Sequence, residues 1–318
     1  MKIASFNIQK FGRNKVSDPG ILNILIKIVS RYDIIVILEV VDASGESVQT
    51  FLDALNKANK KHHYTLKISS RLGRKHYKEQ FMFLYRDDMV DVVGSHQFDD
   101  EATEGGDVFA RDPYILRFRC LGTVLKDLVL IPVHTKPTDS KNELDELYDV
   151  FQHVVKKWRT DNVMILGDFN ADGSYVSSKG MKTIRIRSNK NFHWLIGDDV
   201  DTTASSRNDY TYDRIVVYGD DMLQAVVANS AKPFNFQKSF GLLEEQALKV
   251  SDHYPVEVEL KSVTCEENGL VAPSDCAIID PDLLELKRRN RLLEREKLRL
   301  QIQILQRRKA KMNHEGNF

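Results

Sequence analysis

The sequence has few cysteines: three among 318 residues, Cys120, Cys265 and Cys276, at a spacing that matches no zinc motif. So small and odd a number excludes a fold built around a disulfide framework. Cys120 follows the strand-like segment 114–118 and is expected to be a half-buried thiol. Cys265 and Cys276 lie in a polar stretch and can pair only in an oxidising compartment, so the reduced state is favoured.

Long apolar runs are also missing. No run approaches membrane-spanning length, and the chain starts with the strand-like Lys2–Phe6 instead of a charged and apolar leader. We therefore expect a soluble protein with no membrane partner, which is neither exported nor membrane-spanning. A hydrophobic content of 42% at this length is enough for one large or two small cores.

Net charge is absent as well, because 46 basic residues cancel 46 acidic ones. The balance conceals an asymmetry. Residues 283–312 contain eleven Lys and Arg against three Glu, which leaves 35 basic against 43 acidic residues elsewhere. An acidic body still accommodates a polyanionic substrate where bound divalent cations reverse the local sign of the charge.

Several catalytic motifs are absent too. The sequence has no Gly-rich phosphate loop, no Cys₄ or His₃ zinc spacing and no Gly-x-Ser-x-Gly elbow. These absences exclude P-loop phosphoryl transfer, zinc sites of those types and the serine-hydrolase elbow.

Hydrophobic periodicity predicts an α/β layout with many strands and few helices. A helix is expected to open at Asp18-Pro19, and further helices cover 47–57 and 144–158. Strands are predicted over 2–6, 34–38, 64–68, 81–85, 90–93, 128–133, 163–167, 214–217, 225–227 and 256–260. This order favours two sheets packed together over one doubly wound sheet.

Two segments place chemistry where a strand meets a loop. The apolar run 163–166 ends in Gly167-Asp168-Phe169-Asn170, and Ser251-Asp252-His253 precedes the last predicted strand. A buried strand normally runs into turn residues without chemistry, so acids and amides at this place indicate a metal or phosphate site. Two such segments predict one shared cleft.

Other polar residues near strand ends are weak signals one by one: Asn7, Glu39, Glu79, His134 and Asp213. Each has an ordinary structural explanation, such as a solvated loop or a hydrogen-bonded core histidine. Together they supply what phosphodiester hydrolysis needs. Two histidines oriented by carboxylates provide a base and an acid, and carboxylates and amides hold a divalent cation that stabilises the phosphorane-like centre.

Residues 1–261 resemble the deoxyribonuclease I family within the endonuclease/exonuclease/phosphatase superfamily. Seven segments carry the resemblance in order: 2–9, Leu72-Gly73-Arg74, Tyr77-Lys78-Glu79, 167–171, Asp201-Thr202-Thr203, 212–216 and 251–256. The resemblance implies a four-layer α/β/β/α sandwich with two packed mixed β-sheets. It also implies a metal-dependent endonuclease that hydrolyses DNA with little sequence specificity and leaves 5′-phosphate ends.

The resemblance assigns roles by position. His134 with Glu79 and His253 with Asp213 are similar to the acid–base pairs, and either imidazole can begin as the acid. Glu39 resembles the ligand of Mg²⁺, or of Mn²⁺. The family's groups that place metal and scissile phosphate are matched by Asn7, Asp168, Asn170 and Asp252, and its DNA contacts are matched by Arg111 and Tyr77.

The sequence also departs from the family pattern. Val41 stands where the family has a minor-groove arginine, which should weaken insertion into the groove. Calcium sites are matched in part. One involves Asp99, Asp107, Phe109 and Asp112, with Asp112 shorter than the usual glutamate, and the other keeps Asp201 and Thr203 but has Ser205 and Arg207 in place of threonines.

Both family disulfides are missing. For one of them, the first half-cystine is replaced around Asp172-Gly173 and its partner around Tyr210-Thr211. A secreted protein loses about 2–5 kcal/mol without such a bridge. We therefore expect a cytoplasmic or nuclear protein in preference to a secreted one.

The resemblance does not cover the tail, where 262–282 reads as a linker, 283–312 as a basic amphipathic helix and 313–318 as an end segment. Leu286, Leu293 and Leu300 recur every seven residues, offset against Leu283, Asn290, Lys297 and Ile304. This heptad pattern predicts a parallel homodimer. The flanking basic clusters equally fit a nucleic-acid contact or a nuclear address, and a solvated charged helix is the plain alternative.

Two further functions stay open from sequence: a phosphodiesterase or phosphatase of the same fold that acts on another phosphate substrate, and a catalytically idle scaffold. Tyr77-Lys78-Glu79 argues against the first, and the two complete His–carboxylate pairs argue against the second. Actin binding, known for the type member of the family, also stays open, because Leu66-Lys67-Ile68 places a lysine near the apolar edge it would use.

Overall fold

The computed structural model of the protein describes residues 1–99 and 106–263 and seven separate positions, 286, 289, 290, 293, 294, 297 and 301. Its contacts divide the chain into two units, Met1–Val263 and Thr264–Phe318. The first unit contains the two sheets and every predicted site residue.

The first sheet has six strands around a central parallel pair. In spatial order they are β11 (Lys232–Pro233), β12 (Val256–Glu259), β1 (Lys2–Phe11), β2 (Ile34–Val40), β4 (Gln80–Arg86) and β3 (Tyr64–Ile68). The parallel pair is β1 and β2, and the other neighbours are antiparallel. Strand β2 reads Ile-Ile-Val-Ile-Leu because it is buried on both faces.

The second sheet has the same number of strands and also a central parallel pair. Its order is β5 (Val90–Gln97), β6 (Tyr114–Cys120), β7 (Asp127–His134), β8 (Val163–Asp168), β10 (Asp213–Tyr218) and β9 (Phe192–Trp194). Here β7 and β8 are the parallel pair. Each sheet therefore brings the carboxyl ends of two adjacent strands to one edge.

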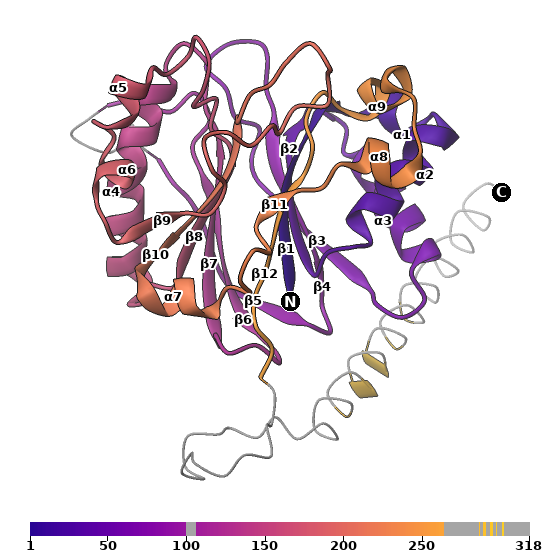
Figure 1. The fold of residues 1–318 in the computed structure, drawn as a ribbon. Coiled ribbons are helices and arrows are strands. Elements are labelled where there is room, and N and C mark those ends of the chain that lie inside the picture. The colour runs from indigo at the N-terminus through magenta and orange to yellow at the C-terminus, as the bar shows by residue number, and fades with distance from the viewer. Residues whose placement is uncertain are drawn as a thin grey trace, which may run out of the picture. The chain divides into compact units, whose positions relative to one another are not determined.

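Helices cover the outer face of each sheet (Figure 1). Beside the first sheet lie α1 (Arg13–Val16), α2 (Pro19–Val29), α3 (Glu46–Ala58), α8 (Phe236–Phe240) and α9 (Glu244–Val250). Beside the second lie α4 (Ser140–Trp158), α5 (Ser178–Met181) and α6 (Arg185–Ser188), and α7 (Gly219–Ala225) follows β10. Asp18 caps α2 as predicted, because its carboxylate accepts hydrogen bonds from the backbone N–H groups of Gly20 and Ile21.

Three apolar layers hold these elements together. The central layer joins the inner faces of the two sheets, for example Ile3 and Val36 with Leu130 and Leu166. The other two layers bury one face of the helices against each sheet. The predicted four-layer α/β/β/α sandwich is confirmed.

Two local predictions were wrong. Within the predicted strand 225–227, Ala225 is the last residue of α7, and Val226 forms an isolated bridge to Leu260 instead of a strand. A short apolar run does not distinguish a strand from a buried helix end. Cys120 is fully buried instead of half-buried, because it closes β6 and packs between the sheets, and burial raises the pKa of its thiol to about 12.

The tail prediction lies mostly outside the described residues. Leu286, Asn290, Leu293 and Lys297 are helical and exposed, whereas the linker after residue 263 and Leu283, Leu300 and Ile304 are outside the part of the chain that the structure describes. Dimerisation and nucleic-acid contact through this segment stay predictions. Among the described residues, no helix is long and apolar enough to cross a membrane.

Gly167 is the position where the parallel pair of the second sheet depends on the absence of a side chain. Its φ is 146°, and a Cβ there would lie 2.0 Å from the carbonyl oxygen of Val133 on β7. We expect Gly167→Ala to lower the free energy of unfolding by at least about 3 kcal/mol. The positive φ is unfavourable for alanine, and the methyl group would overlap the Val133 carbonyl oxygen. Urea unfolding measures this change.

Gly219 provides the matched control for this substitution. Its φ is also positive, at 80°, but a Cβ there would meet nothing within 4 Å. Gly219→Ala should therefore cost only the backbone strain, about 1 kcal/mol. Equal losses in the two variants would contradict the close approach of β8 to β7.

Candidate active site

The site forms where both parallel pairs end. His134 is the last residue of β7 and stands opposite Asp168, the last residue of β8. Asp168 also stands opposite Asp213, the first residue of β10. From the first sheet, Asn7 of β1 and Glu39 of β2 reach the same place, because the Asn7 side-chain amide donates to Glu39 Oε1 at 3.0 Å and to Asp168 Oδ2 at 3.1 Å.

A bulge in β1 shapes this edge. Gln9 and Lys10 both adopt positive φ, 48° and 60°, and the pairing of β1 with β2 shifts register between Asn7 and Phe11. The bulge aims polar groups at the site. The Gln9 N–H donates to Asn7 Oδ1, the Gln9 side-chain amide donates to Asp252 Oδ2, and the Lys10 N–H donates to Glu39 Oε2. Backbone strain is thus concentrated at the candidate site, as it is in many active sites.

The first imidazole, His134, is held from behind by a carboxylate. Its Nδ1 lies 2.7 Å from Glu79 Oε2, and Arg111 donates to the other oxygen of Glu79 and to the backbone oxygen of His134. Burial alone would lower the pKa of His134, but the Glu79 carboxylate outweighs it and the pKa is raised. Burial likewise acts to raise the pKa of Glu79, and His134 and Arg111 together lower it.

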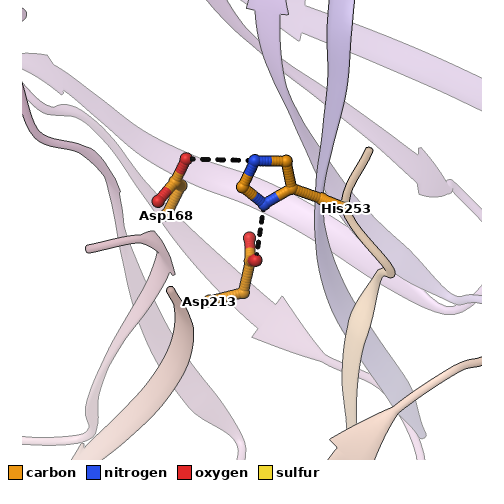
Figure 2. A group of neighbouring side chains, drawn as sticks. All are labelled: Asp168, Asp213 and His253. Atoms are coloured by element: carbon orange, nitrogen blue, oxygen red, sulfur yellow. Dashed lines mark hydrogen bonds and ion pairs between the residues drawn. The ribbon is translucent and has the colours of Figure 1, made fainter. Parts of the chain in front are cut away.

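The second imidazole, His253, has the same arrangement (Figure 2). Its Nδ1 lies 2.7 Å from Oδ2 of the fully buried Asp213, which also accepts a hydrogen bond from Thr202 Oγ1. Burial acts to lower the pKa of His253, but Asp213 and Asp168 raise it to about 10. Burial raises the pKa of Asp213 to about 6 against the opposing effect of His253. The Asp213 carboxylate at Nδ1 therefore favours the imidazolium form of His253.

The two imidazoles converge on one atom. Nε2 of His134 and Nε2 of His253 each lie 3.7 Å from Oδ2 of Asp168. The two Nε2 atoms are therefore separated by no more than twice that distance, although the two residues are 119 positions apart in the sequence. This spacing leaves both rings within reach of a single phosphate group.

The donor set fits a divalent cation. Glu39 and Asp168 provide hard oxygen ligands on either side of Asn7, and single ligand atoms of Asp168, Asp213 and His253 lie within 4.8 Å of one another. Oδ1 of Asp213 is buried and has no hydrogen-bond partner, so the site retains an unsatisfied oxygen beside these groups. Carboxylates gathered this closely repel one another unless positive charge lies between them.

The remaining predicted site residues surround this centre. Asn170 has φ 45°, donates its N–H to Asp168 Oδ1 and its side-chain amide to Thr135 O. Tyr77 is exposed, with 47% of the residue accessible, and Asp252 is partly exposed, with 43% of its side chain accessible. The buried acid–base pairs therefore adjoin groups that reach solvent, as substrate access requires.

The six predicted calcium residues lie in two other segments. Asp107 is exposed and pairs with the Arg74 guanidinium at 3.1 Å, and its segment also contains Asp99, Phe109 and Asp112. In the second segment, Oδ1 of Asp201 accepts hydrogen bonds from both the N–H and the hydroxyl of Thr203. Calcium binding at these positions stays a prediction.

The segments that lack the half-cystines still meet. Asp172 Oδ2 accepts a hydrogen bond from the Thr211 N–H at 2.8 Å. The ring of Tyr210 packs on Gly173, where a Cβ would lie only 2.9 Å from the ring. Tyr210 also stacks on Tyr212 at a centroid distance of 5.0 Å. A hydrogen bond and an aromatic contact thus join the two segments without a covalent link.

Some supporting residues were not singled out from sequence. Gln9 binds Asp252, Thr202 binds Asp213, and Ser251 accepts from the His253 N–H and donates to the Asn7 carbonyl. Each lies within a segment that carried the resemblance, so proximity to the motif was the available signal. Glu143 of α4 gave no such signal. It is buried, accepts from the Lys136 N–H, and burial raises its pKa to about 7.

The chain is similar to proteins of a known family. The profile of the Endonuclease/Exonuclease/phosphatase family matches residues 4–253. Deoxyribonuclease gamma of Homo sapiens is 42% identical over 263 residues, which cover 82% of this chain and 86% of that protein. Deoxyribonuclease-1 of Oryctolagus cuniculus is 46% identical over 261 residues, which cover 82% and 92%.

Solved structures agree on the fold. A family protein from Leptotrichia buccalis C-1013-b superposes with a TM-score of 0.58 at 16% identity, covering 82% of this chain and 99% of that one. The human Nocturnin catalytic domain gives a TM-score of 0.55 at 13% identity, covering 83% and 94%. The sequence similarity thus agrees with the fold and with the paired imidazoles at the strand ends. The chain belongs to the endonuclease/exonuclease/phosphatase family, and within it to the deoxyribonuclease I-like proteins.

Proposed function

We propose that this protein is a divalent-metal-dependent endonuclease that hydrolyses DNA phosphodiester bonds with little sequence specificity and leaves 5′-phosphate ends. One observation carries the proposal: two carboxylate-oriented imidazoles present Nε2 to the same oxygen of Asp168 at 3.7 Å. Hydrolysis needs a proton acceptor on one side of the phosphorus and a proton donor on the other. The spacing of the two rings suits that division of roles.

The chain's residues account for the proton movements. One imidazole accepts a proton at Nε2 from the attacking water as its oxygen bonds to phosphorus. The other donates its Nε2 proton to the 3′ oxygen as the phosphorus–oxygen bond breaks. Glu79 and Asp213 each bind Nδ1, so they fix the ring orientation and stabilise the imidazolium form. The products are a 5′-phosphate and a 3′-hydroxyl, and atoms and charge balance.

Positive charge at the phosphate comes from two sources in this proposal. Glu39, Asp168 and Asn7 would hold Mg²⁺ or Mn²⁺, which supplies electrostatic stabilisation of the pentacovalent phosphorus when it is bound. Arg111, which contacts Glu79 and the His134 carbonyl, places a guanidinium beside the same acid–base pair. Asn170 and Asp252 complete the surroundings of the scissile group.

The similarity to known proteins supports DNA as the substrate. Deoxyribonuclease gamma and deoxyribonuclease-1 are each more than 40% identical to this chain over more than four-fifths of its length. The exposed Tyr77 next to Glu79 offers a ring to the groove of a duplex. In the described residues, nothing favours a smaller phosphate ester over this substrate.

A reducing compartment, cytoplasm or nucleus, fits the proposal. The segments that would carry the family disulfide are joined by the Asp172–Thr211 hydrogen bond and the contact of Tyr210 with Gly173. Antibody detection of the intact protein in fractionated cells tests this location. We expect the signal in cytoplasmic or nuclear fractions, and recovery from the medium alone would contradict it.

Substitution of either imidazole tests the chemistry. We expect the protein to nick supercoiled plasmid in the presence of Mg²⁺ and to lose this activity on chelation. His134→Ala and His253→Ala should each lower the rate by a factor on the order of 10² or more, because each removes a proton-transfer group. Initial rates of nicking on agarose gels give the measurement.

His63→Ala is the matched control, since His63 also pairs with an aspartate, Asp87 at 2.9 Å, but lies just before β3. It should keep the wild-type rate. Equal nicking by wild type and both site variants would reveal a contaminating nuclease and leave the proposal without support.

Restoring a cation at Val41 tests how the duplex is bound. Val41 follows β2, its N–H donates to the Phe11 carbonyl, and its side chain is partly exposed near Glu39. We expect Val41→Arg to lower KM for duplex DNA and to steepen the dependence of log(kcat/KM) on log[salt] by about 0.9, the effect of one additional phosphate contact. Val41→Leu is the uncharged control and should change neither quantity. An unchanged salt slope in Val41→Arg would show that this position does not face DNA.

A further inference from the structure

Lys15 is a buried lysine that the chemistry above does not use. It lies in α1, just beyond the bulge of β1, and only 8% of it is exposed. Its Nζ donates to the carbonyl oxygens of Lys249 at 2.9 Å and Val250 at 2.8 Å. Burial lowers the pKa of Lys15, while the negative charges of Asp252 and Glu39 act against this shift. Burying an ammonium group is costly, so these two hydrogen bonds indicate a specific task.

Both carbonyls belong to the C-terminal end of α9. The last carbonyls of a helix have no partner within the helix, and the helix dipole makes this end negative. The Lys15 ammonium satisfies two of these oxygens and places a positive charge at the dipole's negative end. It thereby fixes where the chain leaves α9.

The chain then enters the site at once. Ser251 turns to an extended conformation, and its hydroxyl donates to the Asn7 carbonyl at 2.6 Å and accepts from the His253 N–H at 3.0 Å. Beyond it, Asp252 binds the Gln9 side chain. The segment 251–253 is therefore held against β1 on one side and by the end of α9 on the other.

We propose that Lys15 is a positioning residue: by tying the end of α9 to the segment that follows β1, it keeps Asp252 and His253 in register with Asn7, Glu39 and Asp168. This inference rests on the proposed function for its effect on turnover. Lys15 contacts two backbone oxygens and none of the proposed reacting groups, so it acts through the path of the chain. It makes the first sheet's strand end and the histidine segment one rigid unit.

Lys15→Met tests the inference, because methionine keeps an unbranched side chain but has no N–H donor and no charge. We expect kcat for plasmid DNA to fall by roughly 10- to 100-fold, since displacements of about 1 Å have effects of this size. KM for DNA should stay within about twofold of wild type, because the Lys15 side chain is buried and its Nζ is bound to backbone carbonyls. Amide hydrogen exchange of residues 251–254 should become faster, because their hydrogen bonds depend on this segment's position.

Arg86→Met is the matched control for lost stability. Arg86 is also largely buried and donates to Asp33, Ser30 and the Tyr64 hydroxyl. It closes β4 at the end opposite Glu79, roughly 20 Å away at strand spacing. It should lower the unfolding temperature as much as Lys15→Met, yet keep kcat within about twofold and leave exchange at 251–254 unchanged.

Three outcomes overturn the proposal: an unchanged kcat in folded Lys15→Met, an equal loss of kcat in Arg86→Met, or unchanged exchange at 251–254. Lys15→Gln, which keeps a donating amide, is the second variant if Lys15→Met does not fold. Its control is Arg13→Met, which removes an exposed positive charge from the same helix. We expect kcat to fall further in Lys15→Gln than in Arg13→Met, and an equal or smaller fall in Lys15→Gln would contradict the positioning role. Failure of wild type to cleave DNA would refute the proposed function, while the exchange measurement would still decide the role of Lys15.

Discussion

The carboxylate of Asp168 is the point on which the site depends. It ends β8, accepts a hydrogen bond from Asn7 of the other sheet, and lies 3.7 Å from both imidazoles. Because Asn7 also binds Glu39, two carboxylates approach each other around a single amide. Such an arrangement is unfavourable for isolated charges. The pKa of each imidazole is raised first by its own partner, Glu79 for His134 and Asp213 for His253, and Asp168 acts in the same direction on both. A cation at the same place would relieve the same repulsion.

The two parallel strand pairs explain why these groups meet. Parallel strands bring their carboxyl ends to one edge, so Asp168 and His134 become neighbours as soon as β7 and β8 pair. The equivalent pair β1 and β2 does the same for Asn7 and Glu39. Packing the two sheets face to face then joins the two edges. The fold is therefore the mechanism by which residues far apart in the chain are gathered.

Much of this could be predicted from sequence, for identifiable reasons. An apolar run that ends in Asp168 and Asn170 marks a strand opening into a site, and the alternation of strands and helices indicated two packed sheets. The resemblance to a known family supplied the pairing of Glu79 with His134, which periodicity does not contain. Glu79 itself lies in a polar segment that reads as a solvated loop, yet it is 3% exposed, because His134 and Arg111 enclose it. Burial of this kind depends on partners more than thirty residues away.

The same limit applies to the positions of the missing half-cystines. Composition shows only that cysteines are absent from 172–173 and 210–211, whereas the structure reveals a hydrogen bond and a ring contact in their place. These contribute about 1 kcal/mol each, less than the roughly 3–4 kcal/mol expected of a disulfide that closes a loop of this length. Where thiols stay reduced, the disulfide does not form and contributes nothing to stability. The hydrogen bond and the aromatic contact then contribute more to the free energy of unfolding than the two cysteines would. Tyr210 also continues into a stack with Tyr212, which adjoins Asp213, so the contact that replaces the bridge is connected to the support of His253.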